Sequence, residues 1–250
     1  MEPILPEQTA AIVLAGGFGT RIKHLLGDLP KPMAPVNGRP FLEWVVRFLA
    51  AQNVRRVVLS TGYRAELIEK YFRPQPISGV HVSCVPETTP LGTAGGFLHA
   101  LHQSQISSAA WFLLNGDTLA FVNLADALRA LENPATAGVI FGREVPDASR
   151  YGTLMTDPAG RLAGFAEKRP GRGLISTGVY LFRQSLVEQF SPQVPLSIEQ
   201  EVFPTLTAAG VSLKVLPMNA PFLDIGTPDT LREADLFIHQ NLSKFQTHDL

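Results

Sequence analysis

Short apolar runs rich in β-branched residues alternate with helical patterns through the first half of this chain. The apolar runs predict strands. The segments between them predict helices, because their apolar residues recur at helical spacing. Strands that alternate with helices favour a parallel sheet with helices on both faces. The predicted strands cover residues 11–14, 56–60, 80–85 and 111–114, and the predicted helices cover residues 41–51, 65–71 and 93–102.

The second half has a different pattern, in which short strand-like segments are separated by turns such as the one at 157–160. We expect these strands to join the same sheet as hairpins and to form the substrate-binding portion of one α/β domain over residues 1–250. Thr227 is the predicted N-cap of the last helix, with Pro228 at its first position. The predicted strands cover residues 138–142, 152–155, 162–167, 179–182 and 211–216, and the predicted helices cover 197–209 and 228–240.

The composition excludes several classes of protein. Hydrophobic residues make up 45% of the chain, charged residues 17%, and the net charge is −1, so nothing favours nucleic acid or a membrane as a partner. Cys84 is the one cysteine and lies in an apolar run, which predicts a buried strand thiol in a reducing compartment. No export signal is visible, and no apolar run approaches the roughly 18 residues that cross a membrane. We therefore expect a cytoplasmic protein.

A glycine-rich stretch, Leu14 to Arg21, follows the first predicted strand. Its glycines leave backbone N–H groups free to approach phosphates or a flat base. Arg21 and Lys31 add the two positive charges that a triphosphate needs. The stretch is not a P-loop, which needs Gly-Lys-Ser/Thr, and Ile22 stands where a dinucleotide fingerprint has its third glycine. The alternative is an ordinary strand-to-helix turn.

Two acidic residues occupy places where a parallel sheet binds ligands. Asp117 follows the buried run at 111–114, and Asp224 lies between apolar neighbours just before the last helix. A carboxylate at the mouth of an apolar strand is costly unless it is paired or bound to a metal. Two converging carboxylates would suit Mg²⁺, which also takes substrate phosphates as ligands. The alternatives are a turn residue for Asp117 and a helix cap for Asp224.

A second small-residue stretch at 90–96 begins a predicted helix, with Glu87 shortly before it. A helix N-terminus of this kind can accept an anionic or flat ligand. Glu87 is suited to guanine, because a carboxylate can accept hydrogen bonds from both the ring N–H and the exocyclic amino group. The alternative is a solvated loop carboxylate.

A third cluster, Glu167-Lys168, ends a predicted strand, and its lysine could bind a second phosphate. Taken alone, it would be an exposed charge run. Together the clusters describe a site for a nucleoside triphosphate, a divalent metal and another phosphate. A phosphate monoester, with a second pKa of about 6, is already a dianionic nucleophile near pH 7 and needs no general base. Catalysis would then be positioning and charge neutralisation.

These motifs, in this order, resemble the sugar-1-phosphate nucleotidylyltransferases. The resemblance implies a single Rossmann-like domain with a mostly parallel central sheet, flanked by helices, and a hairpin-rich sugar-binding portion. Residues about 10–135 would bind the nucleotide and about 136–240 the sugar phosphate. Within the family, residues 31–36 and 38–42 look most like the branch that uses GTP and D-glycero-α-D-manno-heptose 1-phosphate. Mannose 1-phosphate, UTP, dTTP or CTP, and a catalytically silent regulatory subunit stay open as alternatives, and a homo-oligomer is compatible with the chain.

Matching positions carry the family's roles over to this sequence. One departure concerns Ser176-Thr177-Gly178. At these three positions relatives often carry Asn-Ala-Gly or Asn-Gly-Gly. This leaves the sugar-hydroxyl contact, and hence the identity of the sugar, open. The resemblance implies Arg21, Lys31 and Asp117 as catalytic residues; Leu14, Ala15, Gly16, Gly17, Gly19, Thr20, Glu87, Gly92 and Thr93 as nucleotide-binding; Gly116, Gly152, Glu167, Lys168, Ser176 and Thr177 as sugar-phosphate-binding; and Asp117 and Asp224 as Mg²⁺ ligands.

Overall fold

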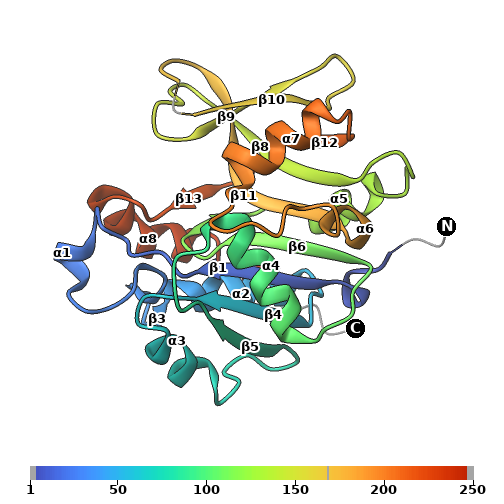
Figure 1. The fold of residues 1–250 in the computed structure, drawn as a ribbon. Coiled ribbons are helices and arrows are strands. Elements are labelled where there is room, and N and C mark those ends of the chain that lie inside the picture. Colours follow the sequence, from blue (N-terminus) through green and yellow to red (C-terminus); the bar gives the residue numbers. More distant parts are fainter. Residues whose placement is uncertain (1–3, 168, 247–250) are drawn as a thin grey trace.

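A mixed nine-stranded sheet forms the centre of the computed structural model, which describes residues 4–167 and 169–246 (Figure 1). Seven strands follow the order β10-β9-β11-β6-β1-β4-β5, and β8 lies between β11 and β12. The strands are β1 (Ala10–Ala15), β4 (Arg56–Thr61), β5 (His81–Pro86), β6 (Ala110–Asn115), β8 (Gly138–Val145), β9 (Gly152–Thr156), β10 (Leu162–Glu167), β11 (Gly173–Arg183) and β12 (Leu213–Met218).

The first half of the chain supplies the parallel part of this sheet. β1 pairs in parallel with β4 and β6, and β4 pairs in parallel with β5. β11 then runs antiparallel to both β6 and β8, and β9 and β10 form an antiparallel hairpin beyond it. The predicted α/β class, with a mostly parallel central sheet and a hairpin-rich second half, is confirmed.

Helices cover both faces of the parallel strands, with α4 in front of the sheet and α2 behind it in Figure 1. In β1, Ala11 and Val13 pack in one core with α2, whereas Ala10 and Ile12 pack in the other core with α4. All four are fully buried, which explains why this strand is a continuous apolar run. The helices are α1 (Lys23–Leu26), α2 (Phe41–Ala51), α3 (Ala65–Phe72), α4 (Gly92–Ser104), α5 (Leu124–Ala130), α6 (Gln184–Val187), α7 (Phe203–Ala208) and α8 (Pro228–Gln240).

The C-terminal helices show one confirmed boundary and one correction. Thr227 caps α8 as predicted, because its Oγ1 accepts from Thr230 N at 3.4 Å. The single helix predicted over 197–209 is instead a π-helical turn, Ile198–Val202, followed by α7. Pro204 has no N–H for a regular helical hydrogen bond, so the helical register changes at this point.

Two short strands were not predicted from the sequence, and they matter for function. β7 (Thr118–Ala120) and β13 (Phe222–Asp224) pair antiparallel, and their register sets Asp224 opposite Thr118. Each is three residues long, too short to produce a periodic pattern. This pairing places Asp224 next to the turn that contains Asp117.

A buried acidic residue fixes the segment that follows Lys31. Glu43 of α2 is fully buried and accepts hydrogen bonds from Arg39 Nη1 (2.7 Å), Arg47 Nε (2.6 Å) and the Tyr71 hydroxyl. Burial, helped by this hydrogen bond and the charge of Glu43, raises the pKa of Tyr71 to about 12. The cluster ties α2 to α3 and to the short hairpin of β2 (Pro35–Val36) and β3 (Arg39–Pro40).

Two further expectations concern the thiol and membrane spans. Cys84 is a free, partly buried thiol on β5, and burial raises its pKa to about 11, which opposes a nucleophilic role. Across residues 4–167 and 169–246, every helix is too short or too polar to span a membrane.

Candidate active site

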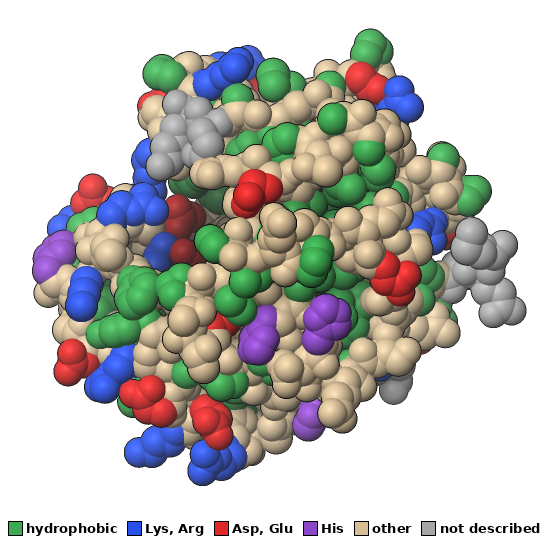
Figure 2. All heavy atoms as spheres, viewed as in Figure 1, with side chains coloured by type: hydrophobic (Ala, Val, Ile, Leu, Met, Phe, Trp, Pro, Cys, Tyr) green, Lys and Arg blue, Asp and Glu red, His purple; other side chains and the backbone are tan. Residues whose placement is uncertain are grey.

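A cavity of about 350 Å³ opens at the carboxyl ends of β1 and β6. Figure 2 shows a hollow on the left of the molecule with acidic and basic side chains in its floor. This is the edge at which α/β sheets bind ligands. The cavity gathers most of the predicted triphosphate residues: its lining is Leu14, Gly16, Gly17, Gly19, Thr20, Arg21, Ile22, Lys31, Pro32, Thr93, Asn115, Asp117 and Gly226.

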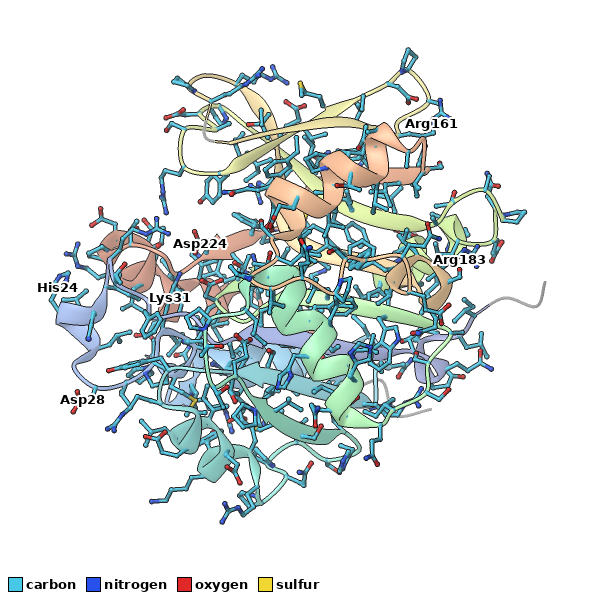
Figure 3. All side chains as sticks on the ribbon, viewed as in Figure 1. His24, Asp28, Lys31, Arg161, Arg183 and Asp224 are labelled. Atoms are coloured by element: carbon cyan, nitrogen blue, oxygen red, sulfur yellow. The ribbon has the colours of Figure 1, made fainter. Side chains whose placement is uncertain are left out.

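Lys31 lies between the two predicted metal ligands. Its Nζ is 2.6 Å from Asp117 Oδ2 and 3.4 Å from Asp224 Oδ1, and only 9% of its side chain is exposed. Figure 3 shows Lys31 and Asp224 side by side at this mouth, far from Arg161 and Arg183. A second cation, Arg150 Nη2, lies 3.7 Å from Asp224 Oδ2. The structure therefore brings Asp117 and Asp224 together around the Lys31 ammonium, with Arg150 on the far oxygen of Asp224.

Backbone contacts place both carboxylates. Gly116 N donates to Leu14 O at 2.8 Å, and a Cβ at Gly116 would come within 2.7 Å of that oxygen. Only glycine permits this approach, which turns the chain so that Asp117 enters the cavity. The N–H of Ile225 donates to the carbonyl of Asp117 at 3.1 Å, so the chain after Asp224 is attached to the same turn.

The donor set at this mouth suits a magnesium ion. Among the residues that the structure describes, no three His, Cys, Asp or Glu side chains form a complete metal cage. Mg²⁺ rarely uses such a cage, and it typically takes one or two carboxylates together with substrate phosphates. The ammonium group between Asp117 and Asp224 shows that the pair attracts a cation. These two residues would hold the metal, with the remaining ligands supplied by phosphates and water.

The glycine-rich loop packs directly on Lys31. Gly19 has a positive φ of 58°, and a Cβ there would lie 2.7 Å from Lys31 Cβ. The close approach places the loop against the stem of the lysine. Arg21 is exposed and lines the same cavity, so both predicted triphosphate cations border one space.

A second cavity, of about 430 Å³, continues from the first, because Leu14, Gly16, Gly17 and Thr93 line both. It is bordered by Glu87 and by two aromatic side chains, Phe18 and Tyr63. Its lining is Leu14, Gly16, Gly17, Phe18, Gly62, Tyr63, Glu87, Thr88, Thr89, Pro90, Leu91, Gly92 and Thr93.

Glu87 is held in place rather than freely solvated. Its Oε1 accepts from Ser60 Oγ at 2.7 Å, and its Oε2 accepts from Leu91 N at 3.3 Å. A Cβ at Gly96 would come within 2.5 Å of Oε1, so the absence of a side chain there makes room for the carboxylate. Each carboxylate oxygen keeps a further lone pair for a ligand in the second cavity.

The start of α4 differs from the expected anion site. The N–H groups of Ala94 and Gly95 both donate to Leu196 O, at 2.9 and 3.2 Å, and so are not free for a ligand. Gly92 has a positive φ of 78°, and a Cβ there would collide with the same carbonyl. Thr93 Oγ1 is also engaged, since it donates to Glu199 Oε2 at 3.1 Å. Gly92 and Thr93 border the cavity, but this helix end is closed by the chain itself.

Of the predicted sugar-phosphate residues, Gly116 lies in the turn after β6, whereas Gly152, Glu167, Ser176 and Thr177 lie on β9, β10 and β11. Gly152 is paired with Glu167, and a Cβ at Gly152 would collide with the Phe165 ring, which explains the glycine. Thr177 is only 2% exposed and its Oγ1 donates to Phe141 O at 2.9 Å, so its side chain does not reach a cavity. Lys168 lies outside the described residues.

Comparison with known protein families assigns this chain to a family. Residues 10–241 match the family model described as nucleotidyl transferase. The chain belongs to the nucleotidyl transferase family.

The alignments with named relatives cover nearly the whole chain. D-glycero-alpha-D-manno-heptose 1-phosphate guanylyltransferase of Campylobacter jejuni is 34% identical over 88% of this chain and 95% of its own length. The enzyme of the same name from Aneurinibacillus thermoaerophilus is 33% identical over 90% and 96%. Mannose-1-phosphate guanylyltransferase of Mycobacterium tuberculosis is 33% identical over 89% of this chain but 62% of its own length. HddC from Yersinia pseudotuberculosis, solved in complex with GMP-PN, is 31% identical with a TM-score of 0.77, covering 91% of this chain and 98% of that chain.

Several residues of this nucleotidyl transferase site were not predicted from the sequence. Arg150 and Tyr151 precede Gly152, and the Arg150 guanidinium lies 5.4 Å from the Tyr151 ring centre. Burial raises the pKa of Tyr151, and the charge of Asp224 adds to the effect. Phe18 is 54% exposed, with its ring 5.6 Å from that of Tyr63 at the rim of the second cavity. Phe18 lies between Gly17 and Gly19, and Tyr151 directly precedes Gly152. These predicted glycines were the sequence signals that could have pointed to the two aromatic residues.

Proposed function

We propose that this chain transfers the guanylyl group of GTP to a sugar 1-phosphate, with D-glycero-α-D-manno-heptose 1-phosphate as the acceptor, Mg²⁺ as the cofactor, and a GDP-sugar and pyrophosphate as products. The observation that carries the proposal is the continuity of two cavities, one with the Lys31–Asp117–Asp224 cluster and one with Glu87. The heptose relatives that match along nearly their whole length support the choice of acceptor.

The reaction needs positioning more than proton transfer. A phosphate oxygen of the dianionic sugar phosphate attacks the α-phosphorus of GTP, and the bond between that phosphorus and the bridging oxygen to the β-phosphate breaks. The electron pair leaves with pyrophosphate, so no general base is required. Arg21 and Lys31 would neutralise charge on the triphosphate, and Mg²⁺ held by Asp117 and Asp224 would supply Lewis-acid stabilisation of the phosphate oxygens.

The nucleotide and the sugar phosphate would bind to different parts of one domain over residues 1–250. Residues about 10–135 would supply most of the nucleotide site, to which Asp224 and Gly226 add from the C-terminal part, and Gly152, Glu167 and Lys168 from residues about 136–240 would bind the sugar phosphate. Mannose 1-phosphate is the second candidate acceptor, because mannose-1-phosphate guanylyltransferases match at a similar identity. The lone Cys84 supports a reducing, cytoplasmic location. A homo-oligomer remains compatible with the proposal.

Pyrophosphate release tests the proposal directly. The purified chain is assayed with Mg²⁺ against GTP, UTP, dTTP and CTP, each with heptose, mannose and glucose 1-phosphates. We expect the highest kcat/KM with GTP and the manno-configured heptose 1-phosphate. Higher kcat/KM with mannose 1-phosphate would replace the acceptor, and no release with any pair, despite binding of a nucleotide sugar, would favour the silent regulatory subunit.

Glu87→Gln tests how the base is read. The amide replaces one acceptor with a donor that opposes the guanine N–H groups, so kcat/KM for GTP is expected to fall about 30-fold or more. Steady-state kinetics with GTP and UTP measure the change in preference. The matched control is Glu66→Gln, whose side chain on α3 is 63% exposed and outside both cavities. An unchanged preference for GTP in Glu87→Gln would remove Glu87 from base recognition.

A further inference from the structure

Asn115 stands at the point where the nucleotide part meets the sugar part. It is the last residue of β6, and it lines the first cavity together with Lys31 and Asp117. The neighbouring strand on one side is β11, whose pairing with β6 runs up to Val179 opposite Leu114. The register of β11 against β8 shifts between Ser176 and Tyr180, so the strand is irregular beside Asn115.

Gly178 gives the Asn115 side chain its space. Gly178 lies within the irregular part of β11 and has a positive φ of 71°. A Cβ there would collide with Asn115 Nδ2 and lie 2.8 Å from Asn115 Cγ. Any other residue at 178 would therefore displace the amide, which means that the two positions are fitted to each other.

The polar groups around Asn115 are already engaged. Ser176 Oγ and Tyr180 OH form a hydrogen bond of 2.9 Å, and Gly178 N donates to Ser176 Oγ at 3.3 Å. Thr177 Oγ1 donates to Phe141 O. Within residues 4–167 and 169–246, by contrast, the half-buried Asn115 side chain makes no hydrogen bond. Its amide thus keeps a donor and an acceptor for a ligand in the cavity.

We propose that Asn115 determines sugar specificity by hydrogen-bonding a ring hydroxyl of the sugar 1-phosphate. An amide that both donates and accepts matches a hydroxyl group, and Asn115 lies beside the charged cluster that would take the phosphates. This contact replaces the one expected from Ser176 and Thr177, whose side chains bind within the protein. The inference rests on the proposed function, since it requires a sugar 1-phosphate as acceptor.

Deoxy analogues of the substrate provide the test. Wild type and Asn115→Ala are assayed with GTP and with mannose 1-phosphate and its 2-, 3- and 4-deoxy analogues. Wild type should lose about tenfold or more in kcat/KM on the analogue that lacks the contacted hydroxyl. Asn115→Ala should show a similar loss with the parent sugar and no further loss with that analogue, whereas its KM for GTP should stay within about threefold of wild type.

Two more variants separate recognition from structure. Gly178→Ala pushes a methyl group against the Asn115 amide and should reproduce the altered sugar preference. Asn123→Ala removes an exposed asparagine that caps α5, outside both active-site cavities, and should leave sugar preference unchanged. Melting temperatures identify any variant that is merely destabilised.

The outcomes distinguish failure of the Asn115 inference from failure of the proposed function. If wild type releases pyrophosphate and Asn115→Ala loses activity in equal proportion on every deoxy analogue, the Asn115 inference is wrong and the proposed function stands. If wild type releases no pyrophosphate with any sugar 1-phosphate, the proposed function fails and the inference fails with it.

Discussion

Asp117→Ala is expected to lower kcat for pyrophosphate release by about 10³-fold, equivalent to about 4 kcal/mol of transition-state stabilisation. The carboxylate of Asp117 is one of two that meet around Lys31, and its Oδ2 makes the shorter contact, at 2.6 Å. Without it, the site keeps one carboxylate for a divalent ion and Lys31 loses its closest partner. Steady-state rates are measured at several Mg²⁺ concentrations, because a lost metal ligand should also shift the concentration that gives half the maximal rate.

Asp229→Ala is the matched control for this prediction. Asp229 lies in the first turn of α8, is 80% exposed and pairs with Arg232, away from both cavities. Its removal should leave both the rate and its Mg²⁺ dependence unchanged. A rate for Asp117→Ala within fivefold of wild type would show that Asp117 is not a metal ligand.

The periodic sequence patterns of β1 and β6 predicted the position of the site residues that directly follow these strands. Asp117 follows the buried run of β6, and Gly16, Gly17 and Gly19 follow β1, so sequence position alone places them at one edge of the sheet. The carboxyl ends of neighbouring parallel strands necessarily meet there. This is why the sequence could predict that these residues border one cavity.

Contacts between distant segments could not be read in this way. Asp224 reaches Asp117 through the pairing of β13 with β7, and three-residue strands have no periodicity to detect. The start of α4 looked like a ligand site because its residues are small, yet Leu196, about a hundred residues later, takes the N–H groups of Ala94 and Gly95. The size of those residues reflects chain packing, which the local sequence does not distinguish from ligand binding.

Lys31→Met is expected to lower the stability of the metal-free protein and also to lower kcat. The Lys31 ammonium is almost buried between Asp117 and Asp224, and without it the two carboxylates face each other, with the nearer remaining ion-pair partner being Arg150, 3.7 Å from Asp224, among the residues that the structure describes. Because Asp117 is one-third exposed, the cost is below that of a fully buried pair, at about 2 kcal/mol. This corresponds to a fall in Tm of roughly 4–8 °C in EDTA.

Mg²⁺ should reverse much of that loss. A divalent ion can replace the missing positive charge, so saturating Mg²⁺ should raise the Tm of Lys31→Met by more than it raises that of wild type. Catalysis should not recover, because a charge on the triphosphate is still lost, and kcat is expected to stay about 10²-fold below wild type. Lys70→Met, an exposed lysine on α3, is the control for loss of a surface charge. If Lys31→Met and wild type respond equally to Mg²⁺, then the ammonium and the metal do not share the same two carboxylates.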